Sequence, residues 1–123
     1  MVRIALVDDS RLVRVAASAA LRAKGYEVVE IEPTSMFDVL KVLHETPMDL
    51  VLVDLLMPAC SGEHLVRACR EDALLADLPI LIVSAHRDEA SLASLQQLGI
   101  SGFLLKPMDP STLAARVAEA LAD

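Results

Sequence analysis

Short apolar runs alternate with helical patterns along the whole chain. The five runs are residues 2–7, 26–31, 50–53, 80–83 and 102–105. Continuous apolarity over four to six residues is typical of strands that are buried on both faces. The run at 26–31 is more polar than the others, which predicts a strand nearer an edge of the sheet.

Between these runs, apolar residues recur at the spacing of amphipathic helices. The predicted helices cover residues 10–24, 37–45, 65–74, 87–98 and 111–121. Gly25 and Gly99 follow two of them as stop signals. Five strand–helix units in a chain of 123 residues predict an open parallel sheet with helices on both faces, since a closed eightfold barrel needs about twice the length.

Polar residues directly follow four of the five predicted strands. Asp8 and Asp9 follow the first strand, Asp54 the third, Ser84 the fourth and Lys106 the fifth. The carboxyl ends of parallel strands form the ligand-binding edge of such sheets. Three carboxylates at one edge repel each other unless a cation is present, and oxygen ligands favour magnesium. A lysine and a hydroxyl there suit a phosphoryl group, so the sequence predicts a magnesium-dependent phosphoryl site with an aspartate as candidate nucleophile.

A simpler interpretation exists for each of these residues taken alone. A lone aspartate after a strand is usually a turn residue or a helix N-cap, and for Asp9 by itself this interpretation is favoured. A lone lysine near a strand end is usually a solvated charge. The joint pattern at four strand ends favours the site.

Composition narrows the functional classes. The net charge of −7 argues against direct nucleic-acid binding. Two cysteines are too few for a disulfide framework and lack the spacing of a zinc site. The apolar runs are too short for a signal peptide or a membrane span. We expect one domain over residues 1–123, in the cytoplasm, with reduced thiols.

Four motifs carry a resemblance to a known family. They are VDDS at 7–10, VDLLMP at 53–58 followed by Gly62, VSA at 83–85 and FLLKP at 103–107. In this order and at strand ends, they resemble the receiver domain of bacterial two-component response regulators. The likeness covers essentially the whole chain, which is similar in size to the single-domain chemotaxis type. It implies a flavodoxin-like, doubly wound, five-stranded parallel sheet in the order 2-1-3-4-5, with five helices on both faces.

The resemblance assigns the acids and the metal. Asp54 resembles the phospho-accepting aspartate and is also a Mg²⁺ ligand. Asp9 resembles the direct Mg²⁺ ligand, and Asp8 the acid that holds the ion through water. The backbone carbonyl of Leu56 is the remaining protein ligand in this pattern. An apolar Leu56 side chain does not orient an attacking water by hydrogen bonding, and its position tunes acyl phosphate hydrolysis in the family.

The other motif residues resemble those that respond to phosphorylation in the receiver family. Ser84, where threonine is commoner, resembles the hydroxyl that bonds a phosphoryl oxygen, and Phe103 resembles the switch aromatic. Lys106 resembles the lysine that pairs with Asp54 and then with the phosphoryl group. The implied structural positions are Pro58, Gly62 and Pro107, the last after a cis peptide bond with Lys106.

The predicted function is that of a signalling receiver which is not an enzyme beyond its own phosphoryl transfer and dephosphorylation. The expected partners are a histidine kinase or histidine phosphotransfer protein and a downstream target. The target is expected to bind the face formed by the fourth helix, the fifth strand and the fifth helix. A weak homodimer is left open, and neither nucleic acid nor membrane is expected as a partner.

Two alternatives come from other classes. A phosphatase or phosphotransferase with an aspartate nucleophile would show Asp-x-Asp after the first strand and a cap domain, whereas here the acids are adjacent. A phosphorylation-independent docking module would not require the matched polar set.

The first predicted helix also suggests where a phosphodonor docks. Its inward stripe is expected to be Val13, Ala16, Ala17, Ala20 and Leu21. On the remaining face, Val15 and Ala19 would form an apolar centre rimmed by Arg11, Arg14 and Arg22. Isolated exposed aliphatic residues are also common without any function.

Overall fold

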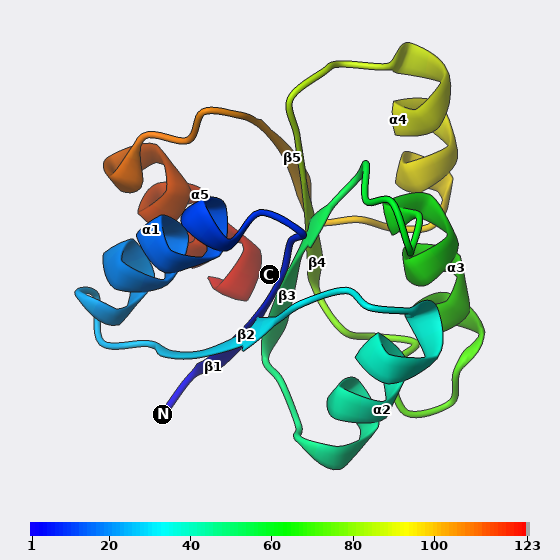
Figure 1. Ribbon diagram of the computed structural model, residues 1–123, viewed down its shortest axis with the longest axis horizontal. Coiled ribbons are helices and arrows are strands. Elements are labelled where there is room, and N and C mark those ends of the chain that lie inside the picture. The colour runs from blue at the N-terminus through cyan, green and yellow to red at the C-terminus, as the bar shows by residue number, and fades with distance from the viewer. Residues whose placement is uncertain (123) are drawn as a thin grey trace.

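Five parallel strands form one sheet in the order β2-β1-β3-β4-β5, which confirms the predicted topology. The computed structural model describes residues 1–122. The strands are β1 (Arg3–Val7), β2 (Glu27–Ile31), β3 (Leu50–Asp54), β4 (Ile80–Ser84) and β5 (Gly102–Leu105). The helices are α1 (Arg11–Arg22), α2 (Met36–Glu45), α3 (Gly62–Glu71), α4 (Glu89–Gln97) and α5 (Pro110–Ala122). Strands and helices alternate strictly along the chain (Figure 1).

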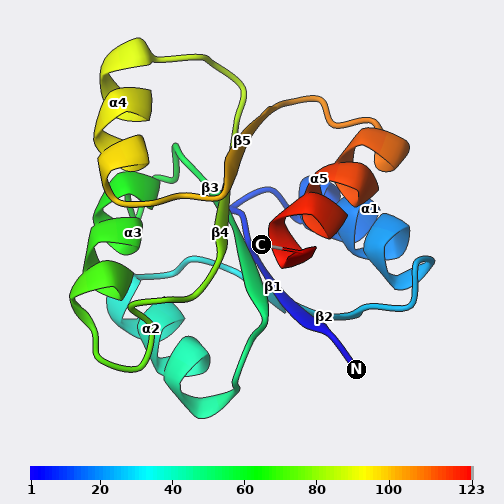
Figure 2. The same cartoon turned by 180° about the vertical axis from the view of Figure 1, so that it is seen from behind.

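The helices cover both faces of the sheet. Helices α1 and α5 lie on one side, and α2, α3 and α4 lie on the other (Figures 1 and 2). Successive residues of β1 point to opposite sides: Ile4 and Leu6 join the core under α1 and α5, and Ala5 and Val7 join the core under α2 to α4. The central strands β1, β3 and β4 are therefore apolar except at one end residue each, because both of their faces are buried. The more polar strand β2 lies at an edge, as the sequence predicts.

The third helix begins and ends three residues earlier than predicted. It ends at Glu71, and Leu74 lies beyond it with 78% of its surface exposed. The carboxylate of Asp72 accepts a hydrogen bond from the Leu74 N–H at 2.9 Å. Such a side-chain turn competes with helical bonding, which accounts for the early end.

The inward face of α1 differs from the prediction. Its buried residues are Arg14, Ala17, Ser18 and Leu21, whereas Ala16 is exposed. The guanidinium of Arg14 donates to the backbone oxygen of Asp8, so a polar contact rotates this side chain inward. The expected outer face therefore loses Arg14, although Val15 and Ala19 remain exposed.

Every helix within residues 1–122 is too short to cross a lipid bilayer.

Candidate functional site at the carboxyl edge of the sheet

Strand register brings the predicted residues to one edge. Val7 pairs with Val53, so Asp8 and Asp54 follow paired positions on neighbouring strands. Ser84 pairs with Leu105 at the ends of β4 and β5, and Lys106 comes next in the chain. The side chains that the sequence places after separate strands therefore meet at the carboxyl edge of the sheet, at its central strands.

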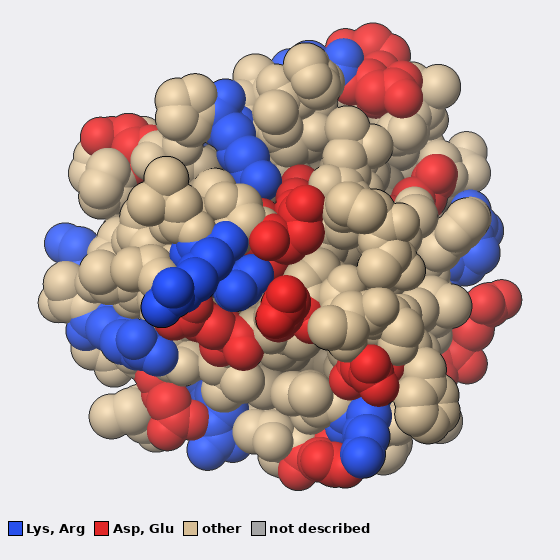
Figure 3. Space-filling view, viewed as in Figure 1, with Lys and Arg blue, Asp and Glu red and all other residues tan. Residues whose placement is uncertain are grey.

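The three acids form a tight cluster. One carboxylate oxygen from each of Asp8, Asp9 and Asp54 lies within 4.8 Å of the others. Asp8 and Asp54 are buried, and Asp9 is exposed. Acidic side chains lie near the middle of the face drawn in Figure 3, with basic side chains beside them and uncharged surface around. Carboxylates this close repel each other, so the cluster favours a bound positive charge.

Lys106 supplies one positive charge to this cluster. Its Nζ lies 2.9 Å from Asp8 Oδ2 and 3.3 Å from Asp54 Oδ2. Burial alone would lower the pKa of Lys106, but its hydrogen bond to Asp8 and the attraction of Asp54 and Asp8 outweigh burial and raise the pKa. The lysine is therefore charged and held at the acids.

A single lysine does not neutralise the site. Burial and the negative charge of Asp8 raise the pKa of Asp54, Lys106 opposes them, and the net result is a pKa raised from 3.8 to about 6. Ionised Asp54 is therefore destabilised near neutral pH, and a hard divalent cation would relieve the repulsion. The donor set, made of carboxylate oxygens at an open edge, suits Mg²⁺.

Asp8 is held from several directions. Its Oδ1 accepts a hydrogen bond from the Ser10 N–H at 2.9 Å, while its Oδ2 faces Lys106. The Ser10 hydroxyl in turn accepts from the Val13 N–H and caps α1. The turn from β1 to α1 thus fixes the first acid.

Ser84 lies at the same edge with its hydroxyl buried. The Ser84 Oγ accepts a hydrogen bond from the His86 N–H at 3.2 Å. The Lys106 N–H donates to the Ser84 carbonyl at 2.8 Å. Ser84 and Lys106 are therefore joined through the backbone, next to the acids.

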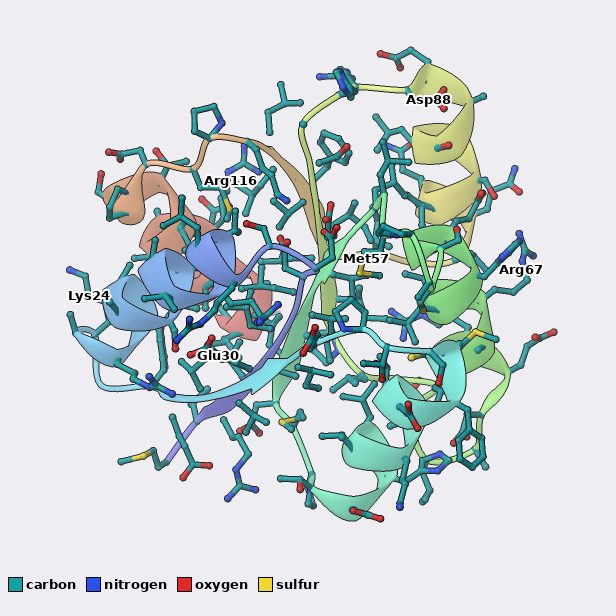
Figure 4. All side chains as sticks on the ribbon, viewed as in Figure 1. Lys24, Glu30, Met57, Arg67, Asp88 and Arg116 are labelled. Carbon is teal, nitrogen blue, oxygen red and sulfur yellow. The ribbon has the colours of Figure 1, made fainter. Side chains whose placement is uncertain are left out.

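Three other predicted residues lie outside the acid cluster. Leu56 is 62% exposed in the loop after β3, and Pro58 of the same loop is exposed. Phe103 in β5 is half-buried against the core under α2 to α4. Met57, between β3 and α3, is buried (Figure 4). The Lys106–Pro107 peptide bond is cis, as the resemblance implies.

Gly62 supports the loop that carries Asp54. A Cβ placed on Gly62 would lie 2.4 Å from the Asp54 carbonyl oxygen and 2.8 Å from Leu55 Cα. The Gly62 N–H donates to the Leu55 carbonyl at 3.0 Å. Only glycine permits this approach of the start of α3 to the end of β3.

Gly62→Ala should therefore destabilise the protein by about 2 kcal/mol, the usual size of an overpacking penalty. Urea unfolding checks this value. The matched control is Gly99→Ala, where the added Cβ meets nothing within 4 Å and only the positive φ of 74° opposes it. A Gly62→Ala loss no larger than that of Gly99→Ala would contradict the steric account.

One buried charged residue at this edge is not indicated by the sequence pattern. Arg14 lies inside, with its Nη1 2.6 Å from the Asp8 carbonyl oxygen. An arginine in an amphipathic helix is normally placed on the outer face, and apolar periodicity gives no sign of this contact.

The fold and the site together define an open parallel α/β domain. Its carboxylates and its lysine meet at the carboxyl edge of the sheet. The profile of the response regulator receiver domain family matches residues 4–118. The chain therefore belongs to the response regulator receiver domain family, whose members act in phosphorylation-activated signalling.

Relatives and solved structures agree with this membership. The phosphate regulon transcriptional regulatory protein PhoB of Pseudomonas aeruginosa is 32% identical over 114 residues, which are 93% of this chain and 49% of that protein. The CAI-1 autoinducer sensor kinase/phosphatase CqsS of Vibrio cholerae is 33% identical over 94% of this chain and 17% of its own length. The chain thus spans about half or less of these curated relatives. The chemotaxis protein CheY4 of Vibrio cholerae superposes with a TM-score of 0.90 at 27% identity, covering 98% of both chains.

Proposed function

We propose that residues 1–123 form one receiver domain that accepts a phosphoryl group on Asp54 and then changes a protein-binding surface. The observation that carries this proposal is the contact of Lys106 Nζ with both Asp8 and Asp54 inside a three-acid cluster. A structural ion pair needs one acid, whereas phosphoryl transfer needs a nucleophile and a surrounding set of charges.

In the proposed transfer, an Asp54 carboxylate oxygen attacks the phosphorus of a phosphohistidine in line. The new bond is O–P, the P–N bond breaks, and its electron pair leaves with the imidazole. Lys106 Nζ already lies 3.3 Å from Asp54 Oδ2. After transfer, the lysine would pair with the phosphoryl oxygens instead of with the carboxylate. The Ser84 hydroxyl oxygen accepts from the His86 N–H, and the hydroxyl would donate its own hydrogen to a phosphoryl oxygen.

The proposed Mg²⁺ ligands are Asp9, Asp54 and the backbone carbonyl of Leu56, with Asp8 acting through water. When bound, Mg²⁺ supplies positive charge to the transferring oxygens. The clustering of the three acids and the raised pKa of Asp54 support this assignment.

The proposed output surface is formed by α4, β5 and α5. Phe103 pairs with Ile82 of β4, two residues before Ser84, so movement of Ser84 has a short route to it. Phe103, Leu105 and Arg116 line a groove of about 350 Å³ on this side. Inward movement of Phe103 would reshape the groove and change its affinity for a target protein.

The phosphodonor is proposed to be a histidine kinase or a histidine phosphotransfer protein in the cytoplasm. Helix α1 begins next to the acids, and a groove of about 380 Å³ runs between α1 and α5 to Lys106. Leu12, which is 80% exposed, lines this groove, and Val15, which is 50% exposed, lies on another side of the same helix. An apolar surface at the mouth of the site suits a partner that must bring its phosphohistidine to Asp54.

Val15→Asp should slow transfer from the cognate kinase at least tenfold, because it buries a charge at the contact. Labelling by acetyl phosphate should stay nearly unchanged, because the acids and Lys106 are untouched. Ala93→Asp is the control, since Ala93 is exposed on α4 in the opposite layer. Equal loss of both rates in Val15→Asp would mean damage to the site and would contradict docking on this face.

Phosphorylation by a small donor tests the proposed function. Wild-type protein with acetyl phosphate and Mg²⁺ should gain one phosphoryl group by intact-mass measurement, and a chelator should prevent it. Asp54→Asn should gain none. Absence of uptake by the wild type would favour a docking module instead.

A further inference from the structure

A buried arginine outside the acid cluster contacts the peptide bond between its first two members. Arg14 Nη1 donates to the Asp8 carbonyl oxygen at 2.6 Å, and only 11% of the Arg14 side chain is exposed. The Asp8 carbonyl belongs to the peptide unit that links Asp8 to Asp9. Because a peptide unit is planar, the direction of this carbonyl sets the direction in which Asp9 leaves the end of β1.

Arg14 is itself held from the edge strand. Its Nε lies 3.8 Å from Glu30 Oε1 in β2, and Glu30 Oε2 lies 3.9 Å from Arg22 Nη1. These distances are too long for hydrogen bonds, so the attraction is ionic. Glu30 belongs to β2, and its side chain lies on the α1 side of this strand (Figure 4). The contacts therefore connect β2, through Arg14, to the acidic turn after β1.

The two acids of this turn differ in how they are held. Both carboxylate oxygens of Asp8 have partners, in Ser10 and Lys106. Asp9 is exposed, yet its carboxylate lies within 4.8 Å of those of Asp8 and Asp54. Repulsion would drive an exposed, mobile Asp9 outward into water, where its charge is better solvated. A fixed backbone opposes that movement.

We propose that Arg14 is a positioning residue for the metal site, which holds the Asp8–Asp9 peptide so that Asp9 faces Asp54 before a cation binds. This inference rests on the proposed function, in which Asp9 and Asp54 ligate Mg²⁺. Groups that orient metal ligands without touching the metal are typically worth about 10–100-fold in affinity.

The direction in which Mg²⁺ affinity changes when Arg14 is replaced distinguishes a positioning role from a purely electrostatic one. Arg14 carries a positive charge near a cation site, so its removal would strengthen Mg²⁺ binding if charge were its only influence. Positioning predicts the opposite, because Asp9 would no longer be held toward Asp54. Arg14→Lys keeps the charge and loses the guanidinium fork, so positioning predicts weaker binding there too.

The test is a Mg²⁺ titration of the full chain, followed by amide NMR shifts. Arg14→Met and Arg14→Lys should each weaken Mg²⁺ binding about tenfold. In metal-free protein, the Asp9 and Ser10 amide signals should move in both variants. Arg22→Met is the matched control, because Arg22 shares the Glu30 partner and also donates to a backbone carbonyl, that of Val28 at 3.1 Å. The control should change Mg²⁺ affinity by no more than about twofold, as expected for an exposed ion pair.

Unchanged or tighter Mg²⁺ binding by folded Arg14→Met would overturn the inference. If Arg14→Met does not fold, Arg14→Lys decides by the same criterion. Wild-type protein that binds no Mg²⁺ would instead contradict the metal role in the proposed function, and so the two failures are distinguishable.

Discussion

Asp54→Asn should stabilise the protein at neutral pH by about 2 to 3 kcal/mol in the absence of metal. Asp54 is 4% exposed, and burial with the nearby Asp8 raises its pKa from 3.8 to about 6. Asparagine has nearly the same shape and carries no charge, so it removes the buried repulsion and can keep the contact with Lys106 as a neutral group.

The pH dependence of this gain follows from the direction of the pKa shift. The folded protein binds the Asp54 proton more tightly than the unfolded chain. Stability from this group is thus fully present below about pH 4 and is lost as the pH rises through about 6. The advantage of Asp54→Asn should be small at pH 4 and complete at pH 7.5.

Urea unfolding at the two pH values, with a chelator present, measures this difference. Asp77→Asn is the control, because Asp77 is an exposed acid in the connection before β4, at the opposite edge of the sheet. Addition of Mg²⁺ should narrow the gap by stabilising the wild type. An Asp54→Asn variant that is less stable than wild type at pH 7.5 would contradict the electrostatic account of the pocket.

Asp9→Ala should weaken Mg²⁺ binding by more than about 100-fold, since even indirect partners of a metal contribute about 10–100-fold. Asp9 is the exposed member of the cluster, so its removal should leave the buried core intact. Calorimetric or NMR titration of Mg²⁺ gives the affinity, and Asp77→Ala controls for the loss of one negative charge. Unchanged affinity in Asp9→Ala would remove Asp9 from the metal site.

Much of this site is predictable because strand ends and register are readable in the sequence. Asp8 and Asp54 each follow a continuous apolar run, and two parallel central strands of similar length place their ends side by side. The same reasoning brings Ser84 and Lys106 to the edge, since β4 and β5 are neighbours. The sheet order itself came from the family resemblance and not from the apolar pattern.

The rotation of α1 is not predictable in this way. Alanine occurs on both the buried and the exposed faces of helices, so it gives little information on which face is buried. Ala16 is expected on the inner face of α1, but Arg14 is buried there instead. What decides their positions is a tertiary contact, the hydrogen bond from Arg14 to the Asp8 carbonyl, together with the charge of Glu30 on β2. The end of α3 before Leu74 likewise depends on one local bond from Asp72.

Chemical location of the phosphoryl group tests the central claim most directly. Borohydride reduces an acyl phosphate to an alcohol, so aspartyl phosphate at position 54 would become homoserine in the peptide that contains it. After incubation with acetyl phosphate and Mg²⁺, tandem mass spectrometry of the reduced protein should find homoserine at position 54 alone. Reduction at Asp8 or Asp9, or a phosphoryl group on His44, His64 or Ser84 that survives borohydride, would contradict the account.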